Sequence, residues 1–114
     1  MDINSFDIIQ DKVVRDGKVA VLVSPGFGAG WYTWNQAHPE LLFLPRVVEM
    51  VLNDTSYHEI EAYVQSIYGE DELYVGGAVD LVVKWVPQGE QFRIEEYDGS
   101  ESLVLANQEK WITA

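Results

Sequence analysis

The chain has 114 residues, of which 47% are hydrophobic, and it carries 19 acidic against seven basic side chains, for a formal net charge of -12. This length and hydrophobic content predict one globular domain over residues 1–114. The negative charge repels phosphate backbones, so we do not expect direct binding to nucleic acid. The chain contains no cysteine, which excludes disulfides, thiolate metal sites and a cysteine nucleophile.

The beginning of the chain has none of the marks of a signal peptide. Residues 1–5 include neither a basic region nor an apolar run. No stretch approaches the roughly 20 apolar residues of a membrane span, so we expect no membrane partner. We therefore expect a cytoplasmic protein, which for a viral protein means the cytoplasm of the host.

The first third of the sequence predicts a β-hairpin. Residues 6–14 mix apolar and polar side chains at roughly strand spacing, and residues 19–23 are apolar throughout and rich in valine. Asp16 and Gly17 lie between them, and Asp-Gly favours the type I′ turn of a tight hairpin.

The middle third predicts helices. A short turn is expected at residues 38–44, followed by a helix that begins at Pro45 and carries an apolar stripe to Leu52. A second helix is expected at residues 57–68, with Ser56 as its N-cap and Gly69 at its end.

The last third predicts strands. They are expected at residues 73–75, 78–86, 91–97 and 102–106. Gly76-Gly77 is expected to bend the chain, and Asp98-Gly99 to form a second hairpin turn. Trp111 and Ile112 are expected to pin the end of the chain to the core. The order of elements predicts an α+β fold, with a mostly antiparallel sheet of about five strands and two helices on one face.

The most distinctive segment is a loop at residues 24–35, which has glycines at every second position from 26 to 30 and four aromatic residues among and after them. Glycine permits positive φ or a close approach of another group, and exposed aromatic rings suit a stacked base. The candidate ligand-binding residues are Ser24, Gly26, Phe27, Gly28, Gly30, Trp31, Tyr32, Trp34 and Asn35.

Each part of this loop has an expected role. Trp31, Tyr32 and Trp34 would stack on a ring, and the amides of residues 26–30 would hold an anionic or polar group. Ser24 and Asn35 would add hydrogen bonds. The side chains expected to offset phosphate charge are Arg15, Arg46 or Arg93.

Neither common phosphate-binding motif is present. No lysine follows Gly30 as a P-loop requires, and Trp31 stands where a dinucleotide-binding loop needs its third glycine. A structural interpretation of the loop also stays open, because Trp31 and Trp34 are three residues apart and such pairs often bury one helix face. Contact with a protein partner, or with a second copy of the chain, is the remaining alternative.

The loop resembles a block found in small uncharacterised proteins of bacteriophages. The resemblance rests on Gly26-Phe27-Gly28-Ala29-Gly30-Trp31-Tyr32-Thr33-Trp34-Asn35, and Tyr97-Asp98-Gly99-Ser100-Glu101-Ser102 belongs to the same pattern. It implies a phage accessory protein without a known chemistry. Small phage proteins of this kind often counter host defence, either by sequestering a nucleotide signal or by blocking a defence complex.

No catalytic constellation, metal site or cofactor is predicted. His38 precedes a proline, His58 begins a helix, and neither has a metal partner at helical spacing. The acidic clusters at 95–98 and 70–72 have the pattern of solvated surface. The sequence thus favours a protein that sequesters a small molecule, such as a nucleotide-derived signal of host defence. The alternative is an acidic inhibitor that binds a basic host protein.

Overall fold

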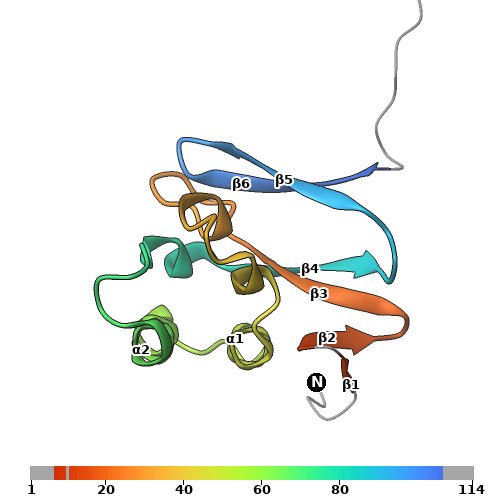
Figure 1. Ribbon diagram of the computed structural model, residues 1–114, viewed down its shortest axis with the longest axis horizontal. Coiled ribbons are helices and arrows are strands. Elements are labelled where there is room, and N and C mark those ends of the chain that lie inside the picture. Colours follow the sequence, from red (N-terminus) through yellow and green to blue (C-terminus); the bar gives the residue numbers. More distant parts are fainter. Residues whose placement is uncertain (1–6, 10, 107–114) are drawn as a thin grey trace, which may run out of the picture.

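A computed structural model of the chain describes residues 7–9 and 11–106. Its strands are β1 (Asp7–Ile9), β2 (Lys12–Arg15), β3 (Lys18–Val23), β4 (Val82–Pro87), β5 (Phe92–Tyr97) and β6 (Ser100–Leu105). Its α-helices are α1 (Pro45–Leu52) and α2 (Tyr57–Tyr68), and short 3-10 helices lie at Tyr32–Trp34, Pro39–Leu42 and Gly76–Asp80. Figure 1 shows these elements in chain order.

The described strands form two antiparallel sheets. One sheet has the order β1-β2-β3-β4, and the other is the hairpin of β5 and β6. Both predicted Asp-Gly hairpin turns are confirmed, since Asp16 and Gly17 have φ of 52° and 75°, and Asp98 and Gly99 have φ of 50° and 85°. Two successive residues with positive φ match the right-handed twist of the strands that they join.

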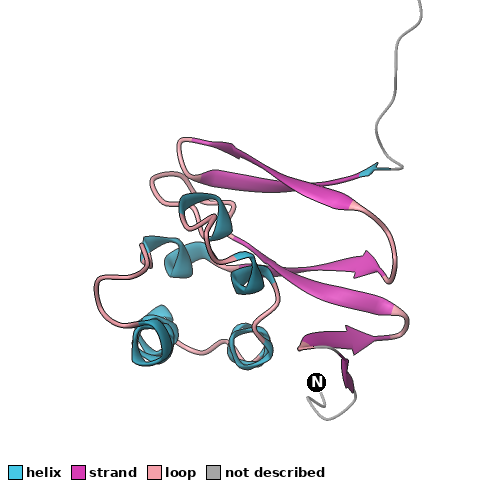
Figure 2. Ribbon diagram, in the orientation of Figure 1, coloured by secondary structure: helices cyan, strands magenta, loops and turns pink. Residues whose placement is uncertain are grey.

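The elements stack in three layers, with the four-stranded sheet in the middle. Figures 1 and 2 show α1 and α2 on one side of β3 and β4, and the β5–β6 hairpin on the other. Alternation along β3 builds both interfaces, because Ala20 and Leu22 join the core under the helices while Val21 and Val23 join the core under the hairpin. The predicted α+β class, antiparallel pairing and placement of the helices on one face are confirmed.

The helices begin and end where local chemistry predicts. Pro45 is the first residue of α1. The Ser56 hydroxyl accepts a hydrogen bond from the His58 amide at 3.3 Å, and Gly69 ends α2 with a φ of 96°. Replacing an N-cap serine by alanine typically lowers stability by about 1 kcal/mol. This preference is why serine marks the start of a helix in a sequence.

The prediction for residues 73–86 was partly wrong. Residues 73–75 form no strand, and residues 76–80 are a 3-10 helix, so that β4 begins only at Val82. The Asn35 side chain satisfies the backbone of Tyr74 instead: it accepts from the Tyr74 amide at 2.8 Å and donates to the Tyr74 carbonyl at 2.9 Å. The segment expected at 6–14 is divided at Asp11, whose φ is 62°.

Two further points complete the fold. Trp111 and Ile112, expected to pin the chain end, lie outside the described residues. Among the helices that are described, none has the length and apolar character needed to cross a membrane.

Candidate functional site

The Gly/Trp loop at residues 24–35 is held against the tip of the β5–β6 hairpin. The Gly28 amide donates to the Asp98 carbonyl at 2.7 Å, and the Ser100 hydroxyl donates to the Pro25 carbonyl at 2.7 Å. The Glu101 amide donates to the Ser24 carbonyl at 2.8 Å. The loop and the hairpin tip therefore form one unit, although more than sixty residues separate them in the sequence.

A buried carboxylate joins the two segments. The Glu101 side chain, on β6, is 2% exposed and accepts hydrogen bonds from the backbone amides of Ser24, Trp31 and Thr33 at 2.8–2.9 Å. The Thr33 hydroxyl adds a fourth donor at 2.6 Å. The amides of residues 26–30 were expected to hold the anionic group of a ligand, but the loop amides that converge on a carboxylate are those of Ser24, Trp31 and Thr33, and the carboxylate is this protein's own. Within 26–30, the Gly28 amide donates to the Asp98 carbonyl instead.

Glu101 was not among the predicted site residues, although the pattern of its strand indicates a buried carboxylate. Residues 101, 103 and 105 share one face of β6, and Leu103 and Leu105 of this face pack on the core under the hairpin. An acidic residue in register with two core leucines predicts a carboxylate that must find donors inside the protein.

The glycines of the loop serve close packing against the rest of the fold. A Cβ atom on Gly30 would collide with the Thr33 hydroxyl, and one on Gly26 would collide with the Asp80 carboxylate. Gly28 has a φ of 101°, which only glycine adopts readily. Close packing therefore accounts for Gly26 and Gly30, and the backbone conformation accounts for Gly28.

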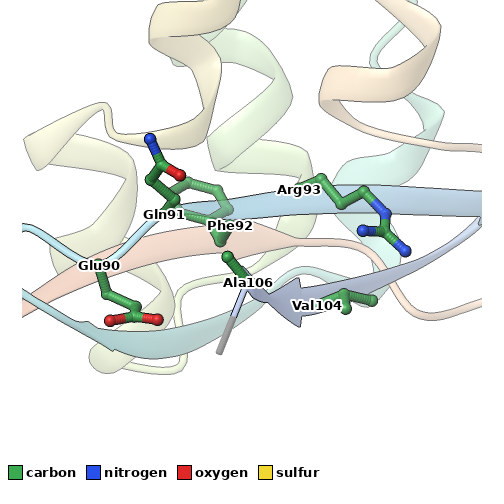
Figure 3. Close-up of a pocket in the computed structure, with 6 residues that line it drawn as sticks. All are labelled: Glu90, Gln91, Phe92, Arg93, Val104 and Ala106. Carbon is green, nitrogen blue, oxygen red and sulfur yellow. The ribbon is translucent and has the colours of Figure 1, made fainter. Parts of the chain in front are cut away.

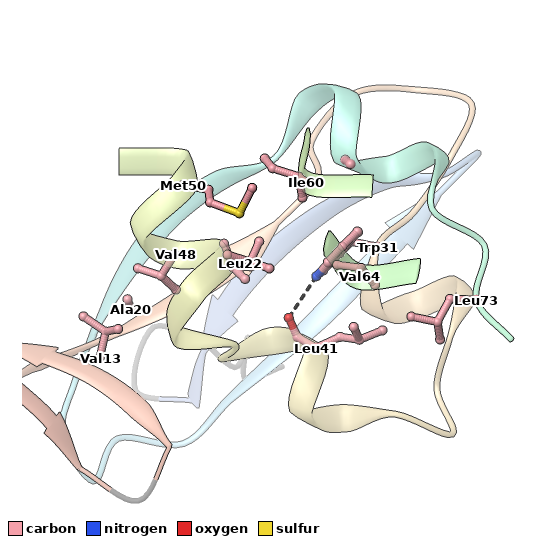
Figure 4. Close-up of a cluster of buried hydrophobic side chains, with 12 residues drawn as sticks. Val13, Ala20, Leu22, Trp31, Leu41, Val48, Met50, Ile60, Val64 and Leu73 are labelled. Carbon is pink, nitrogen blue, oxygen red and sulfur yellow. Dashed lines mark hydrogen bonds between the residues drawn. The ribbon is translucent and has the colours of Figure 1, made fainter. Parts of the chain in front are cut away.

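Trp31 is a core residue. Its side chain is 1% exposed, and its indole N–H donates to the Leu41 carbonyl at 2.8 Å (Figure 4). It packs with Leu22, Val64 and the other side chains drawn in Figure 4. In this structure Trp31 presents no ring face for the predicted stacking on a ligand.

The polar residues at the two ends of the loop are also engaged. Ser24 is 1% exposed, and its amide binds Glu101. Asn35 is 9% exposed and donates to the carbonyls of Trp31 and Tyr74. Their predicted hydrogen bonds therefore go to the protein. Tyr32 is half-buried and packs beside the core.

The outward side of the loop keeps its aromatic residues exposed. Phe27 is 75% and Trp34 39% exposed, and two neighbours that the sequence analysis did not select, Tyr74 and Tyr97, are 52% and 74% exposed. We call these four residues the aromatic face.

The residues of the aromatic face lie around the carboxylate of Glu96. The rings of Trp34 and Tyr74 lie 4.9 Å apart, and the Trp34 indole N–H donates to Glu96 at 3.4 Å. Phe27 and Tyr97 line a hollow of about 410 Å³ together with Glu95 and Glu96. Glu96 thus lies between the two aromatic pairs, and it also accepts from the Gly99 amide at 2.7 Å.

A second hollow lies on the other side of the loop. It measures about 350 Å³ and is lined by Tyr32, Thr33, Gln36 and Leu42, and by Phe92, Arg93 and Ile94 of β5. Three arginines were predicted to offset phosphate charge. Within the described part of the chain, Arg93 is the one that lines this hollow. Arg93 also pairs with Glu95 at 2.8 Å.

His38 forms a separate polar cluster near the end of α2. Its Nε2 lies 2.8 Å from a Glu72 oxygen and its Nδ1 lies 3.3 Å from Glu40, which also accepts from the Tyr68 hydroxyl at 2.8 Å. The hydrogen bond to Glu72 is the largest cause of a raised pKa for the His38 imidazole. The described residues contain no group of three His, Asp or Glu side chains suited to a metal ion.

This cluster predicts a pH dependence of stability. Because folding raises the pKa of His38, the stabilisation from its charged form is complete below the ordinary value of 6.5 and is lost as the pH rises through the raised value. We expect the midpoint of urea unfolding to fall as the pH increases across this interval, and His38→Gln to flatten the dependence. An equal slope in both proteins would contradict the assignment.

Comparison with known proteins adds no family to this description. No family model matches the chain, and no curated protein or solved structure shows significant similarity to it. Function must therefore be argued from the site.

Proposed function

We propose that this protein acts by binding a basic surface of another protein through its aromatic face. The observation that carries the proposal is the exposure of Phe27 and Tyr97, each about three-quarters accessible on adjoining segments. Large aromatic side chains at this exposure are uncommon on soluble domains and are the usual anchors of protein interfaces.

The aromatic face is pre-organised, which favours binding. Glu101 and the bonds of Gly28 and Ser100 fix the loop to the hairpin tip. A partner therefore meets side chains whose supporting backbone is already ordered, and association loses less conformational entropy than it would with a mobile loop.

The charges around the aromatic face indicate the sign of the partner. Glu95, Glu96 and Asp98 lie on the same hairpin tip, and the whole chain carries -12. Of these, Glu95 pairs with Arg93, and Glu96 accepts bonds from two neutral donors, the Trp34 indole and the Gly99 amide. A basic surface is attracted by such a field, and nucleic acid is repelled.

Paired variants test the proposal. We expect Phe27→Ser combined with Tyr97→Ser to abolish co-purification of a stoichiometric protein partner from the native cell, because both anchors are removed. The matched control is Tyr57→Ser combined with Ile67→Ser, which removes two α2 side chains of 37% and 51% exposure at a distant surface. Retained binding in the first variant, or equal loss in both, would contradict the proposal.

Salt provides a second measurement on the same complex. Since the attraction involves exposed charges, raising the ionic strength from about 0.05 M to 0.5 M should weaken the complex at least tenfold. A complex that is insensitive to salt would argue for a partner without a basic surface.

Sequestration of a small molecule is a second candidate, supported by the hollow of about 350 Å³ beside Tyr32. This volume is at the lower end of ligand pockets, and Tyr32 and Arg93 supply a ring and a cation. Calorimetry with cyclic nucleotides and ADP-ribose derivatives tests it. Binding that is weaker than micromolar, or unchanged in Arg93→Gln, would count against it.

The resemblance of the loop to small phage proteins extends the proposal. On that basis we propose a phage accessory protein whose basic partner is a host complex, met in the cytoplasm of the infected cell. The aromatic face could also hold a second copy of the chain, and sedimentation of the Phe27→Ser, Tyr97→Ser variant beside the unaltered protein tests self-association.

A further inference from the structure

We infer that the open edge of β5 receives an extended segment of the basic partner as an added antiparallel or parallel strand. This inference rests on the proposed function and specifies how the partner is held. Strand addition supplies affinity through main-chain hydrogen bonds and specificity through pockets for alternate side chains.

The register of the hairpin shows which backbone groups are open. The Ala106 amide donates to the Gln91 carbonyl at 2.9 Å, and Tyr97 faces Ser100 across the turn. The odd-numbered residues of β5 therefore bond to β6, and the N–H and C=O groups of Phe92, Ile94 and Glu96 point the other way. Within the described part of the chain, β6 is the only strand that pairs with β5.

A groove lies along this edge. The hollow of about 350 Å³ has Phe92, Arg93 and Ile94 on one side, and Tyr32, Gln36 and Leu42 on the other. A hollow of about 460 Å³ at the start of β5 shares Phe92 and Arg93 with this groove, but Val104 and Ala106 also line it, so it extends across the hairpin rather than along the open edge. Figure 3 shows the side chains that line this second hollow, with Gln91, Phe92 and Arg93 along one side and Val104 and Ala106 on the other.

The far end of the groove meets the aromatic face. Glu96 is the last residue of β5 whose N–H and C=O groups point away from β6. Its carboxylate accepts a hydrogen bond from the Trp34 indole. The path from Gln91 to Glu96 spans six residues, or roughly 20 Å, which is the length of an ordinary strand. One extended segment can thus contact both the groove and the aromatic face.

The side chains of β5 select the sequence of the added strand. On the face of Phe92 and Ile94, the segment would place apolar side chains against Tyr32 and Leu42. On the opposite face it would place lysine or arginine near Glu95, whose carboxylate attracts a cation. Where the segment passes Glu96, beyond Phe92 and Ile94, a further basic residue is favoured by that carboxylate and the Trp34 ring. The expected occupant alternates apolar and basic residues.

The four edges of the described sheets differ in a way that supports this choice. The outer edge of β6 is already engaged at one end, where the Glu101 amide donates to the Ser24 carbonyl at 2.8 Å. β1 is only three residues long, and β4 carries Lys84 and Pro87, which are features that block pairing. β5 is six residues long and contains no proline, glycine or lysine. Its two glutamates disfavour pairing with a second β5 but favour a basic strand.

Peptide binding followed by hydrogen exchange tests the inference. The probes are ten-residue peptides in which Lys or Arg alternates with Val, Ile or Phe, beside the same peptides with a central proline and with Glu in place of the basic residues. We expect the alternating basic peptides to bind at least about tenfold more tightly than either control set, as the loss of one or two main-chain hydrogen bonds implies. With the tightest peptide bound, exchange of the Phe92, Ile94 and Glu96 amides should slow at least about tenfold.

A blocking variant provides a second measurement. Gln36 is exposed, so Gln36→Trp should fill the groove without disturbing the fold and weaken the peptide at least about tenfold. Ser66→Trp, at an exposed position on α2, is the matched control and should leave binding unchanged.

The outcomes separate this inference from the proposed function. If the peptides perturb Phe27 and Trp34 but leave exchange at Phe92, Ile94 and Glu96 unchanged, strand addition is wrong and docking on the aromatic face stands. If alternating peptides bind no better than the proline-containing ones, strand addition is also overturned. The co-purification of the Phe27→Ser, Tyr97→Ser variant decides the proposed function independently.

Discussion

Replacing Glu101 by glutamine should destabilise the protein by about 3 kcal/mol, although the two side chains have nearly the same shape. The Glu101 carboxylate accepts from three backbone amides and the Thr33 hydroxyl, and it is 2% exposed. A glutamine has one acceptor oxygen and a donating NH₂ group. If its oxygen keeps the three donors from Trp31 and Thr33, its NH₂ group faces the Ser24 amide, and two donors oppose each other.

Chemical denaturation measures this effect, with Glu95→Gln as the matched control. Glu95 lies on the same hairpin but is exposed, so its replacement should change the free energy of unfolding by no more than about 0.5 kcal/mol. Glu101→Ala should cost more than Glu101→Gln, because it leaves all four donors unsatisfied. Equal stability of Glu101→Gln and the unaltered protein would show that these amides have other partners in solution.

The same substitution also tests the role of the loop in binding. The hydrogen bonds of the Glu101 side chain go to Ser24, Trp31 and Thr33, which are not part of the aromatic face, yet they order the loop from which Phe27 and Trp34 project. Under conditions where Glu101→Gln remains folded, we expect weaker partner binding with the exposed aromatic residues intact.

The fold was predictable where local chemistry decides it. Asp16-Gly17 and Asp98-Gly99 specify their turns because both residues must adopt positive φ, and Ser56 and Gly69 specify the bounds of α2 because helix ends need partners for unpaired backbone groups. The strand predicted at residues 73–75 was wrong because local chemistry does not decide the structure there. Their strand-like composition is overridden by Asn35, a partner almost forty residues away.

The location of the site was predictable, but not the orientation of its side chains. Glycines and aromatic residues at 24–35 correctly indicate an unusual loop, yet nothing local indicates that Glu101 fills its amides. The spacing of Trp31 and Trp34 predicts a shared face only if both belong to one continuous helix. Trp31 instead precedes the 3-10 helix with φ of -100° and ψ of -89°, and this backbone turn sends the two indoles to opposite environments.

The second large expected effect follows from the different burial of Trp31 and Trp34. Trp31→Ala should lower the free energy of unfolding by about 4 kcal/mol, because it empties a core position and leaves the Leu41 carbonyl without its donor. Trp34→Ala should lower it by about 1 kcal/mol or less, since it removes mainly the contact with the Tyr74 ring.

Binding should show the reverse order. Trp34→Ala is expected to weaken the partner complex at least about tenfold in a protein that remains folded, as the loss of an aromatic anchor does elsewhere. Trp31→Phe keeps most of the core volume and should bind normally wherever it is folded. Urea denaturation and partner titration of both variants measure the two effects side by side. If Trp34→Ala proved as destabilising as Trp31→Ala and left binding unchanged, the aromatic face would be part of the packing of the fold, and the binding proposal would lose its physical basis.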